Sequence, residues 1–316
     1  MFCNSFTTMK MLRSSQKYID IYKNINPILT DVSLSDGWKI KMPKDFSFMK
    51  MRDLFHEIMY VEKPNKIDVG PFIGKSVLPV MGDNQQLFHY AGSFKNVYND
   101  SKLPIYSGTL DIGVLVPSYD GLEEALKHNV HHMSFLSSCS NGYQKQFFKK
   151  SIEETKDDLD DIFAVLKKPE NQHITKKLYI SCVDECPISG RIDNDLILHE
   201  IFRYNTKYDL DEICLVDTCG SLKFDNYKYI VDTLIYFGIS RTKLAIKLHV
   251  DTSNKYEMAQ IVRYSLQNKI TRFDVSVLLQ AENCPITGQR RKPIMCYDFF
   301  YGCLKNEIIS QYEREL

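Results

Sequence analysis

Residues 178–266 repeat one pattern three times: a short apolar run followed by a longer stretch with helical spacing. The apolar runs are LYISC (residues 178–182), EICLV (residues 212–216) and LAIKLH (residues 244–249), and the helical stretches are residues 195–204, 226–236 and 256–266. Strands that alternate with helices of this length predict parallel βα units. The same alternation continues outward in both directions along the chain.

Five further apolar runs complete a set of eight predicted strands. They are residues 28–34, 66–69, 112–116, 131–136 and 273–277. Helical spacing follows each of them: at residues 46–60 after the first, in a stretch that ends at about residue 97 after the second, and at residues 119–127, 151–166 and 297–312 after the other three. Eight such units predict a single-domain (β/α)8 TIM barrel over residues 26–316. An open, doubly wound sheet is the alternative. The first strand is followed by no Gly-rich dinucleotide fingerprint, which counts against that alternative.

Residues 1–25 are interpreted as an N-terminal tail that is either flexible or a targeting segment. The first nineteen residues contain Lys10, Arg13 and Lys17 but no Asp or Glu, a composition compatible with a mitochondrial transit peptide or with a frayed polar terminus. The nine cysteines are an odd number and favour a reducing compartment over a disulfide framework. We therefore expect a cytoplasmic protein, with mitochondrial import as the alternative.

The charge balance narrows the choice of partners. Lys plus Arg and Asp plus Glu both number 40, so the formal net charge is zero. A neutral chain has no general attraction for nucleic acid or for an anionic membrane. No apolar run approaches the roughly 20 residues that a spanning helix needs. We therefore expect a small-molecule ligand rather than nucleic acid or lipid.

Polar residues near the carboxyl ends of the predicted strands are the candidate site residues, because barrel enzymes carry their chemistry there. The candidates are Asp36, Asp68, Lys247, His249, Asp251 and Cys284. Asp36 and His249, joined by Asp251, could bind a divalent metal, Mg or Mn with Zn as a further choice. Lys247, His249 and Asp251 would share one face if the strand extended that far.

Each candidate also has an ordinary structural interpretation. Asp36 followed by Gly37 is a common turn, and a single His249 is usually a loop residue with satisfied hydrogen bonds. Only their joint placement at strand ends favours a site. Cys182 and Cys186 have a zinc-like spacing, but no second pair lies nearby, so we interpret them as free thiols with a packing role.

Six short motifs, in order, resemble the hydroxymethylglutaryl-CoA (HMG-CoA) lyase family over about residues 29–298. They are VSLSDG (residues 32–37), IDV (67–69), LPVMGD (78–83), SCVDECP (181–187), VDTCG (216–220) and CP (284–285). The resemblance implies cleavage of HMG-CoA to acetyl-CoA and acetoacetate with a divalent cation that polarises the substrate oxygens. It places Asp36 and His249 among the metal ligands and Cys284 on the catalytic loop.

The chain departs from the family at several of these positions. Ser35 stands where the family has an arginine, and Lys247 stands where it has the first histidine of a His-x-His pair. The family's acidic residue on the second strand is shortened to Asp68, and no asparagine ligand occurs near residues 292–293. A lysine ammonium at a metal-ligand position opposes metal binding by several kcal/mol (about 4 kcal/mol per unit charge at 4 Å and a dielectric of 20).

Three functions follow from this pattern. The first is a divergent carbon–carbon lyase that acts on an acyl-CoA or a 3-hydroxy acid with a metal, with Asp68, Lys247 and Cys284 as catalytic residues. The second is a catalytically inactive barrel kept as a binding or regulatory module. The third is a metal-free aldolase in which Lys247 forms a Schiff base. Related barrels often form dimers, so a homodimer is an expected assembly.

Overall fold

The computed structural model describes residues 16–36, 47–72, 82–100, 110–279 and 292–314. Eight parallel strands close into a barrel in the order β1-β10-β9-β8-β5-β4-β3-β2. The strands are β1 (Ile28–Asp31), β2 (Lys66–Pro71), β3 (Asp111–Leu115), β4 (His132–Ser138), β5 (Thr175–Ser181), β8 (Glu212–Val216), β9 (Leu244–Lys247) and β10 (Arg272–Val275). The predicted (β/α)8 fold is confirmed.

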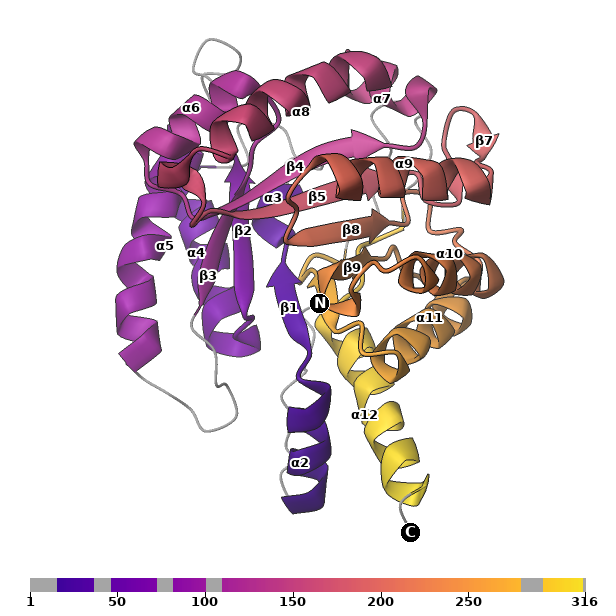
Figure 1. The fold of residues 1–316 in the computed structure, drawn as a ribbon. Coiled ribbons are helices and arrows are strands. Elements are labelled where there is room, and N and C mark those ends of the chain that lie inside the picture. The colour runs from indigo at the N-terminus through magenta and orange to yellow at the C-terminus, as the bar shows by residue number, and fades with distance from the viewer. Residues whose placement is uncertain (1–15, 37–46, 73–81, 101–109, 280–291, 315–316) are drawn as a thin grey trace.

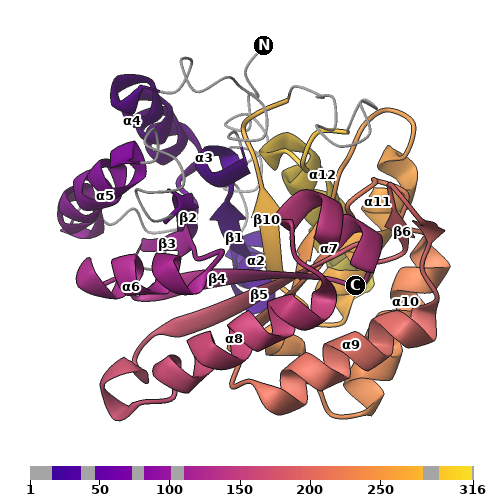
Figure 2. The same ribbon diagram turned by 90° about the horizontal axis from the view of Figure 1, so that it is seen from above.

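Helices surround the strands, as Figures 1 and 2 show from the side and from above. They are α2 (Gln16–Ile25), α3 (Ser33–Asp36), α4 (Phe48–Glu57) with the π-helical turn η3 (Ile58–Glu62), α5 (Gly82–Asp100), α6 (Tyr119–Lys127), α7 (Asn141–Phe148), α8 (Ile152–Leu166), α9 (Asn194–Lys207), α10 (Phe224–Tyr236), α11 (Lys255–Gln267) and α12 (Tyr297–Arg314), with short 3-10 turns η5 (Pro169–Asn171) and η6 (Arg241–Lys243). Ser151 and Glu154 form the capping box expected before α8.

Several local boundaries differ from the prediction. The first strand was expected to run to residue 34, but β1 ends at Asp31 because the Asp31 carboxylate accepts the Ser33 N–H at 2.9 Å and the chain turns into α3. Helix α7 was not predicted, and neither was the hairpin formed by β6 (Glu185–Cys186) and β7 (Gly190–Arg191). Helix α2 covers the end of the predicted tail and lies beside α12.

The barrel interior holds a network of charged side chains. Lys177 of β5 lies 2.6 Å from Asp274 Oδ1 of β10 and 2.8 Å from Glu212 Oε1 of β8. Arg272 also approaches Glu212, at 3.1 Å. Lys177, Glu212 and Asp274 are all buried. Since an unpaired charge is costly inside a protein, these contacts fix how β5, β8 and β10 face one another.

Lys177→Ala would leave Asp274 and Glu212 with less compensating charge in the barrel interior. We expect the free energy of unfolding to fall by about 3–5 kcal/mol, the range for breaking a buried ion pair. Urea denaturation followed by circular dichroism measures it. The matched control is Lys228→Ala, whose exposed partner is Asp232, with an expected change within about 1 kcal/mol. Equal losses in the two variants would contradict a structural role for the network.

Candidate functional site

Three buried side chains from different strands meet on the inner wall of the barrel: Asp68 of β2, Tyr179 of β5 and Lys247 of β9. The Tyr179 hydroxyl donates to Asp68 Oδ2 at 3.2 Å. Lys247 Nζ lies 5.3 Å from the centroid of the Tyr179 ring, within the range of a cation–π contact. The barrel therefore brings together two of the predicted catalytic residues, and we call this set the Asp68–Tyr179–Lys247 cluster.

Burial dominates the protonation of Asp68. It raises the pKa of this carboxyl to about 6, against the opposing charge of Lys177 and the hydrogen bond from Tyr179. The positive charge of Lys247 also acts to lower it. A carboxyl with a pKa near 6 changes protonation state close to neutral pH, so it is suited to both accepting and donating a proton.

Room for the Asp68 carboxylate comes from the neighbouring strand. Gly113 of β3 pairs with Asp68 in the sheet. A Cβ atom at position 113 would lie 2.3 Å from Asp68 Oδ1, far inside van der Waals contact. The absence of a side chain at Gly113 is therefore what lets Asp68 adopt its position.

Tyr179 is the member of the cluster that the sequence analysis missed. Burial raises the pKa of its hydroxyl well above the ordinary value, so this group stays protonated and acts as a donor. Lys177 Nζ also lies over the ring, 4.6 Å from its centroid. Alternation along the strand was the available signal, because Lys177, Tyr179 and Ser181 share one face of β5.

His249 lies just beyond the end of β9, where its backbone bridges Ile294. Its Nδ1 is 2.6 Å from the carbonyl oxygen of Asp217, so Nδ1 carries the proton and Nε2 is the acceptor nitrogen. A second-sphere contact of this kind is typical of metal-binding histidines. The hydrogen bond to the Asp217 carbonyl therefore fixes the orientation of the His249 ring.

Asp251 is held by local contacts. Its carboxylate accepts from the Ser253 N–H at 2.8 Å and from the Ser253 hydroxyl at 2.6 Å, and Lys292 Nζ lies 3.9 Å away. Since β9 ends at Lys247, the expected alternation of side chains does not extend through His249 to Asp251. The Asp36 side chain and the whole of Cys284 lie outside the described residues, so their predicted roles stay predictions.

The described side chains do not fit a divalent metal. Within the ranges given above, no group of three or more His, Cys, Asp or Glu side chains is arranged to hold one. His249 is the imidazole at the end of β9, and the residue two positions earlier is Lys247, which offers an ammonium in place of a lone pair. No chemical step is therefore assigned to a metal here.

Asp217 is a second buried acid at the strand ends that the sequence analysis did not select. Its Oδ1 accepts from the backbone N–H groups of Ser221 and Leu222 at 3.0 and 3.3 Å. Its Oδ2 is buried and has no hydrogen-bond partner among the described residues. Burial raises the pKa of Asp217 to about 7, against those backbone hydrogen bonds.

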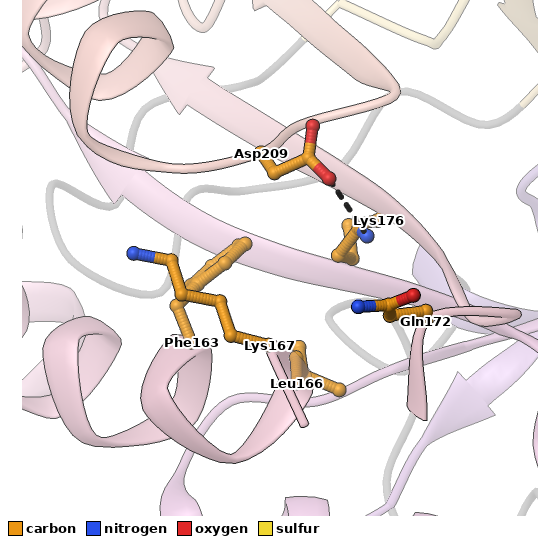
Figure 3. Close-up of a pocket in the computed structure, with 6 residues that line it drawn as sticks. All are labelled: Phe163, Leu166, Lys167, Gln172, Lys176 and Asp209. Atoms are coloured by element: carbon orange, nitrogen blue, oxygen red, sulfur yellow. Dashed lines mark ion pairs between the residues drawn. The ribbon is translucent and has the colours of Figure 1, made fainter. Parts of the chain in front are cut away.

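A pocket of about 370 Å³ lies at the opposite end of the barrel, where β5 begins (Figure 3). Lys176 crosses it to pair with Asp209 at 3.6 Å. Its lining residues are Phe163, Leu166, Lys167, Gln172, Lys176 and Asp209. In TIM barrels this end serves stability and the other end serves chemistry, so the pocket is not part of the candidate site.

No protein-family model matches the chain. Among curated proteins, human mitochondrial hydroxymethylglutaryl-CoA lyase is 25% identical over 154 residues, which cover 49% of this chain and 42% of that protein. The 3-hydroxy-3-isohexenylglutaryl-CoA/hydroxy-methylglutaryl-CoA lyase of Pseudomonas aeruginosa is 25% identical over 211 residues, 67% of this chain and 63% of that protein. The matches thus span about half the length of these relatives.

Solved structures agree on the fold. The hydroxymethylglutaryl-CoA lyase of Pseudomonas aeruginosa superposes with a TM-score of 0.70 at 20% identity, over 89% of this chain and 86% of that one. An HMG-CoA lyase from Acinetobacter baumannii, in complex with coenzyme A and 3-methylmalate, gives 0.71 at 18% identity, over 89% and 84%. The chain is a (β/α)8 barrel with its polar cluster inside the strands. More particularly, its sequence and its fold are both similar to those of HMG-CoA lyases, which confirms the resemblance found in its motifs.

Among the residues that the structure places, no helix combines the length and the apolar character that crossing a bilayer requires.

Raising the pH through 7 should destabilise the protein through Asp217. Its pKa in the folded state, about 7, exceeds the ordinary 3.8, so its contribution is fully present below pH 3.8 and is lost as the pH rises through 7. The shift corresponds to at most about 4 kcal/mol. We expect Asp217→Asn to lose less stability than the parent protein between pH 5 and pH 8 in thermal unfolding. The exposed Asp209→Asn should behave like the parent, and identical pH profiles for all three proteins would refute the assignment.

Proposed function

We propose that this protein is a divergent HMG-CoA-lyase-like carbon–carbon lyase that acts on a small acyl-CoA or a 3-hydroxy acid. The observation that carries the proposal is the Asp68–Tyr179–Lys247 cluster inside the barrel. The names of the related proteins support the reaction class. The coenzyme A and 3-methylmalate bound to one of the solved lyases support the class of ligand.

Asp68 is the proposed proton acceptor. In a retro-aldol cleavage the base removes the proton of the substrate's 3-hydroxyl group, the oxygen electrons form a carbonyl, and the carbon–carbon bond breaks. The electron pair of that bond passes to the departing enolate, which recovers the proton from the Asp68 carboxyl. With a pKa of about 6, Asp68 is largely ionised at pH 7 and ready to begin the cycle.

Lys247 is the proposed electrostatic partner. Its ammonium stands on the inner wall at a position where the resembling family has a metal-binding histidine, and it supplies positive charge for the developing enolate oxygen. Tyr179 positions the carboxylate through its hydrogen bond of 3.2 Å. The predicted Cys284 would add acid–base help from the loop after β10. The predicted homodimer and cytoplasmic location accompany this proposal as predictions.

The metal-dependent form of the mechanism requires Asp36, His249 and Asp251 to converge on Mg, Mn or Zn. In the described part of the chain, Asp251 is engaged by Ser253 and Lys292. Lys247 stands where the resembling family has the first histidine of its His-x-His pair. The proposal therefore uses the Lys247 ammonium in place of a metal, and the choice is tested by restoring the imidazole.

Lys247→His recreates a His-x-His pair with His249. We expect this variant to bind Mn²⁺ or Zn²⁺ at least about tenfold more tightly than the parent protein, a gain of about 1.4 kcal/mol. Isothermal titration calorimetry of both proteins measures it, and Lys247→His with His249→Ala is the control that should lose the gain. Tight stoichiometric binding by the parent protein would instead restore the metal-dependent mechanism.

Asp68→Asn and Lys247→Met should each lower kcat/KM for cleavage of HMG-CoA, or of a related 3-hydroxyacyl-CoA, by at least about 10²-fold. Lys243→Met, a lysine just before the same strand, should leave the rate unchanged. Product formation is followed as free acetyl-CoA. A parent protein that binds coenzyme A but turns over none of these substrates would favour the inactive binding module.

Lys247 also admits a Schiff-base mechanism, since it is a buried lysine beside a buried acid. Borohydride reduction in the presence of a keto acid distinguishes the two uses of this side chain. A trapped adduct on Lys247 would assign the covalent route, and cleavage without any adduct would assign the electrostatic one.

A further inference from the structure

The sulfur of Cys186 is surrounded by hydrogen-bond donors. The Ser140 hydroxyl lies 3.0 Å from it, and the backbone N–H groups of Ile188 and Ser189 lie 3.3 and 3.4 Å from it. The thiol of Cys182 supplies a further hydrogen bond. Such a convergence of donors on one sulfur is a poor match for a neutral thiol, which is a weak acceptor.

The arrangement instead matches a thiolate beside a thiol. The hydrogen bond from Cys182, followed by those from Ser140 and Ser189, lowers the pKa of Cys186 to about 4, despite an opposing contribution from burial. Burial raises the pKa of Cys182 far above its ordinary value. One sulfur of the pair is therefore ionised near neutral pH, and the other keeps its proton and points it at the first.

The backbone conformation at Cys182 is unusual for a residue with a side chain. Cys182 follows the last residue of β5 in the left-handed region, with φ of 62°. Its N–H donates to Thr218 Oγ1 at 2.7 Å. A non-glycine residue adopts this conformation at some energetic cost, so the surrounding contacts must hold it there.

The Cys186 sulfur lies at the base of the β6–β7 hairpin. Cys186 ends β6 and pairs with Gly190 at the start of β7. Cys186 itself is 1% exposed, whereas Ile188 in the turn is 42% exposed. The turn residues Ile188 and Ser189, whose N–H groups bond to the sulfur, thus form part of its cover.

We propose that Cys186 and Cys182 form a peroxide-sensitive dithiol, with Cys186 as the attacking sulfur and Cys182 as the resolving one. The geometry that carries the proposal is the set of donors around Cys186, with a hydrogen bond that joins the two cysteine side chains. The site is separate from the Asp68–Tyr179–Lys247 cluster and does not depend on the proposed lyase activity.

The chemistry balances with a peroxide as the oxidant. The Cys186 thiolate attacks one peroxide oxygen, the O–O bond breaks, and hydroxide leaves with the electron pair, so Cys186 becomes a sulfenic acid. The Cys182 sulfur then attacks that sulfenic sulfur, an S–S bond forms, and the hydroxyl leaves as water with the Cys182 proton. Together the two sulfurs lose two electrons, which the peroxide accepts. An external dithiol reverses the step by reducing the disulfide.

Tryptic cleavage after Lys177 and Arg191 places both cysteines in one peptide, residues 178–191. After brief exposure of the full chain to hydrogen peroxide and alkylation of remaining thiols, we expect this peptide to be lighter by two hydrogen atoms and to carry no alkyl group. The peptide of residues 128–145, in which the buried Cys139 is the one cysteine, should stay reduced. Oxidation of Cys186 no faster than that of Cys139 would overturn the proposal.

Two variants separate the roles of the sulfurs. Cys182→Ser should stop at the sulfenic acid, which dimedone traps on Cys186, whereas Cys186→Ser should give no dimedone adduct on Cys182. Cys139→Ser is the matched control, since Cys139 is buried at the end of β4 and burial raises the pKa of its thiol. Dimedone labelling of Cys182 in the Cys186→Ser protein would show that the roles are assigned wrongly.

Discussion

The ion network around Lys177 is the interaction on which the rest of the barrel depends. A lysine that contacts Asp274 and Glu212 inside a ring of strands ties β5, β8 and β10 to one another across the interior. A buried ion pair of this kind adds little to net stability compared with a packed apolar core, but it penalises every arrangement that leaves one charge without a partner. The network therefore contributes mainly to the specificity of the strand arrangement and its register, and less to the net free energy of folding.

The candidate site is in direct contact with that network. Tyr179 is two residues beyond Lys177 on the same face of β5, and its ring contacts both Lys177 and Lys247. Asp68 is affected by the Lys177 charge more than by the Lys247 charge, which follows from the order of effects on its pKa. The Tyr179 ring and the Asp68 carboxylate both favour a positive charge on Lys247.

The fold could be predicted from the sequence because each strand contains a short apolar run, and the runs recur with helical stretches between them. Asp68 and Lys247 were identifiable for the same reason, since strand ends are visible in the pattern. Tyr179 was missed because an aromatic residue in an apolar run looks like core. Asp251 was expected to continue the face of Lys247, but the strand stops there and Ser253 takes its carboxylate. Such contacts depend on where a chain turns, and spacing alone does not record it.

The close approach of Gly113 and Asp68 also constrains which residues related barrels can carry at these two positions. The space that its missing side chain leaves is filled by the Asp68 carboxylate, with 2.3 Å between Asp68 Oδ1 and the place where a Cβ would stand. Substitutions at positions 68 and 113 are therefore coupled. A methyl group at position 113 of β3 would require a smaller or differently oriented residue at position 68 of β2. Among homologous barrels, these two alignment columns should covary, and an acid at the first should be accompanied by glycine at the second.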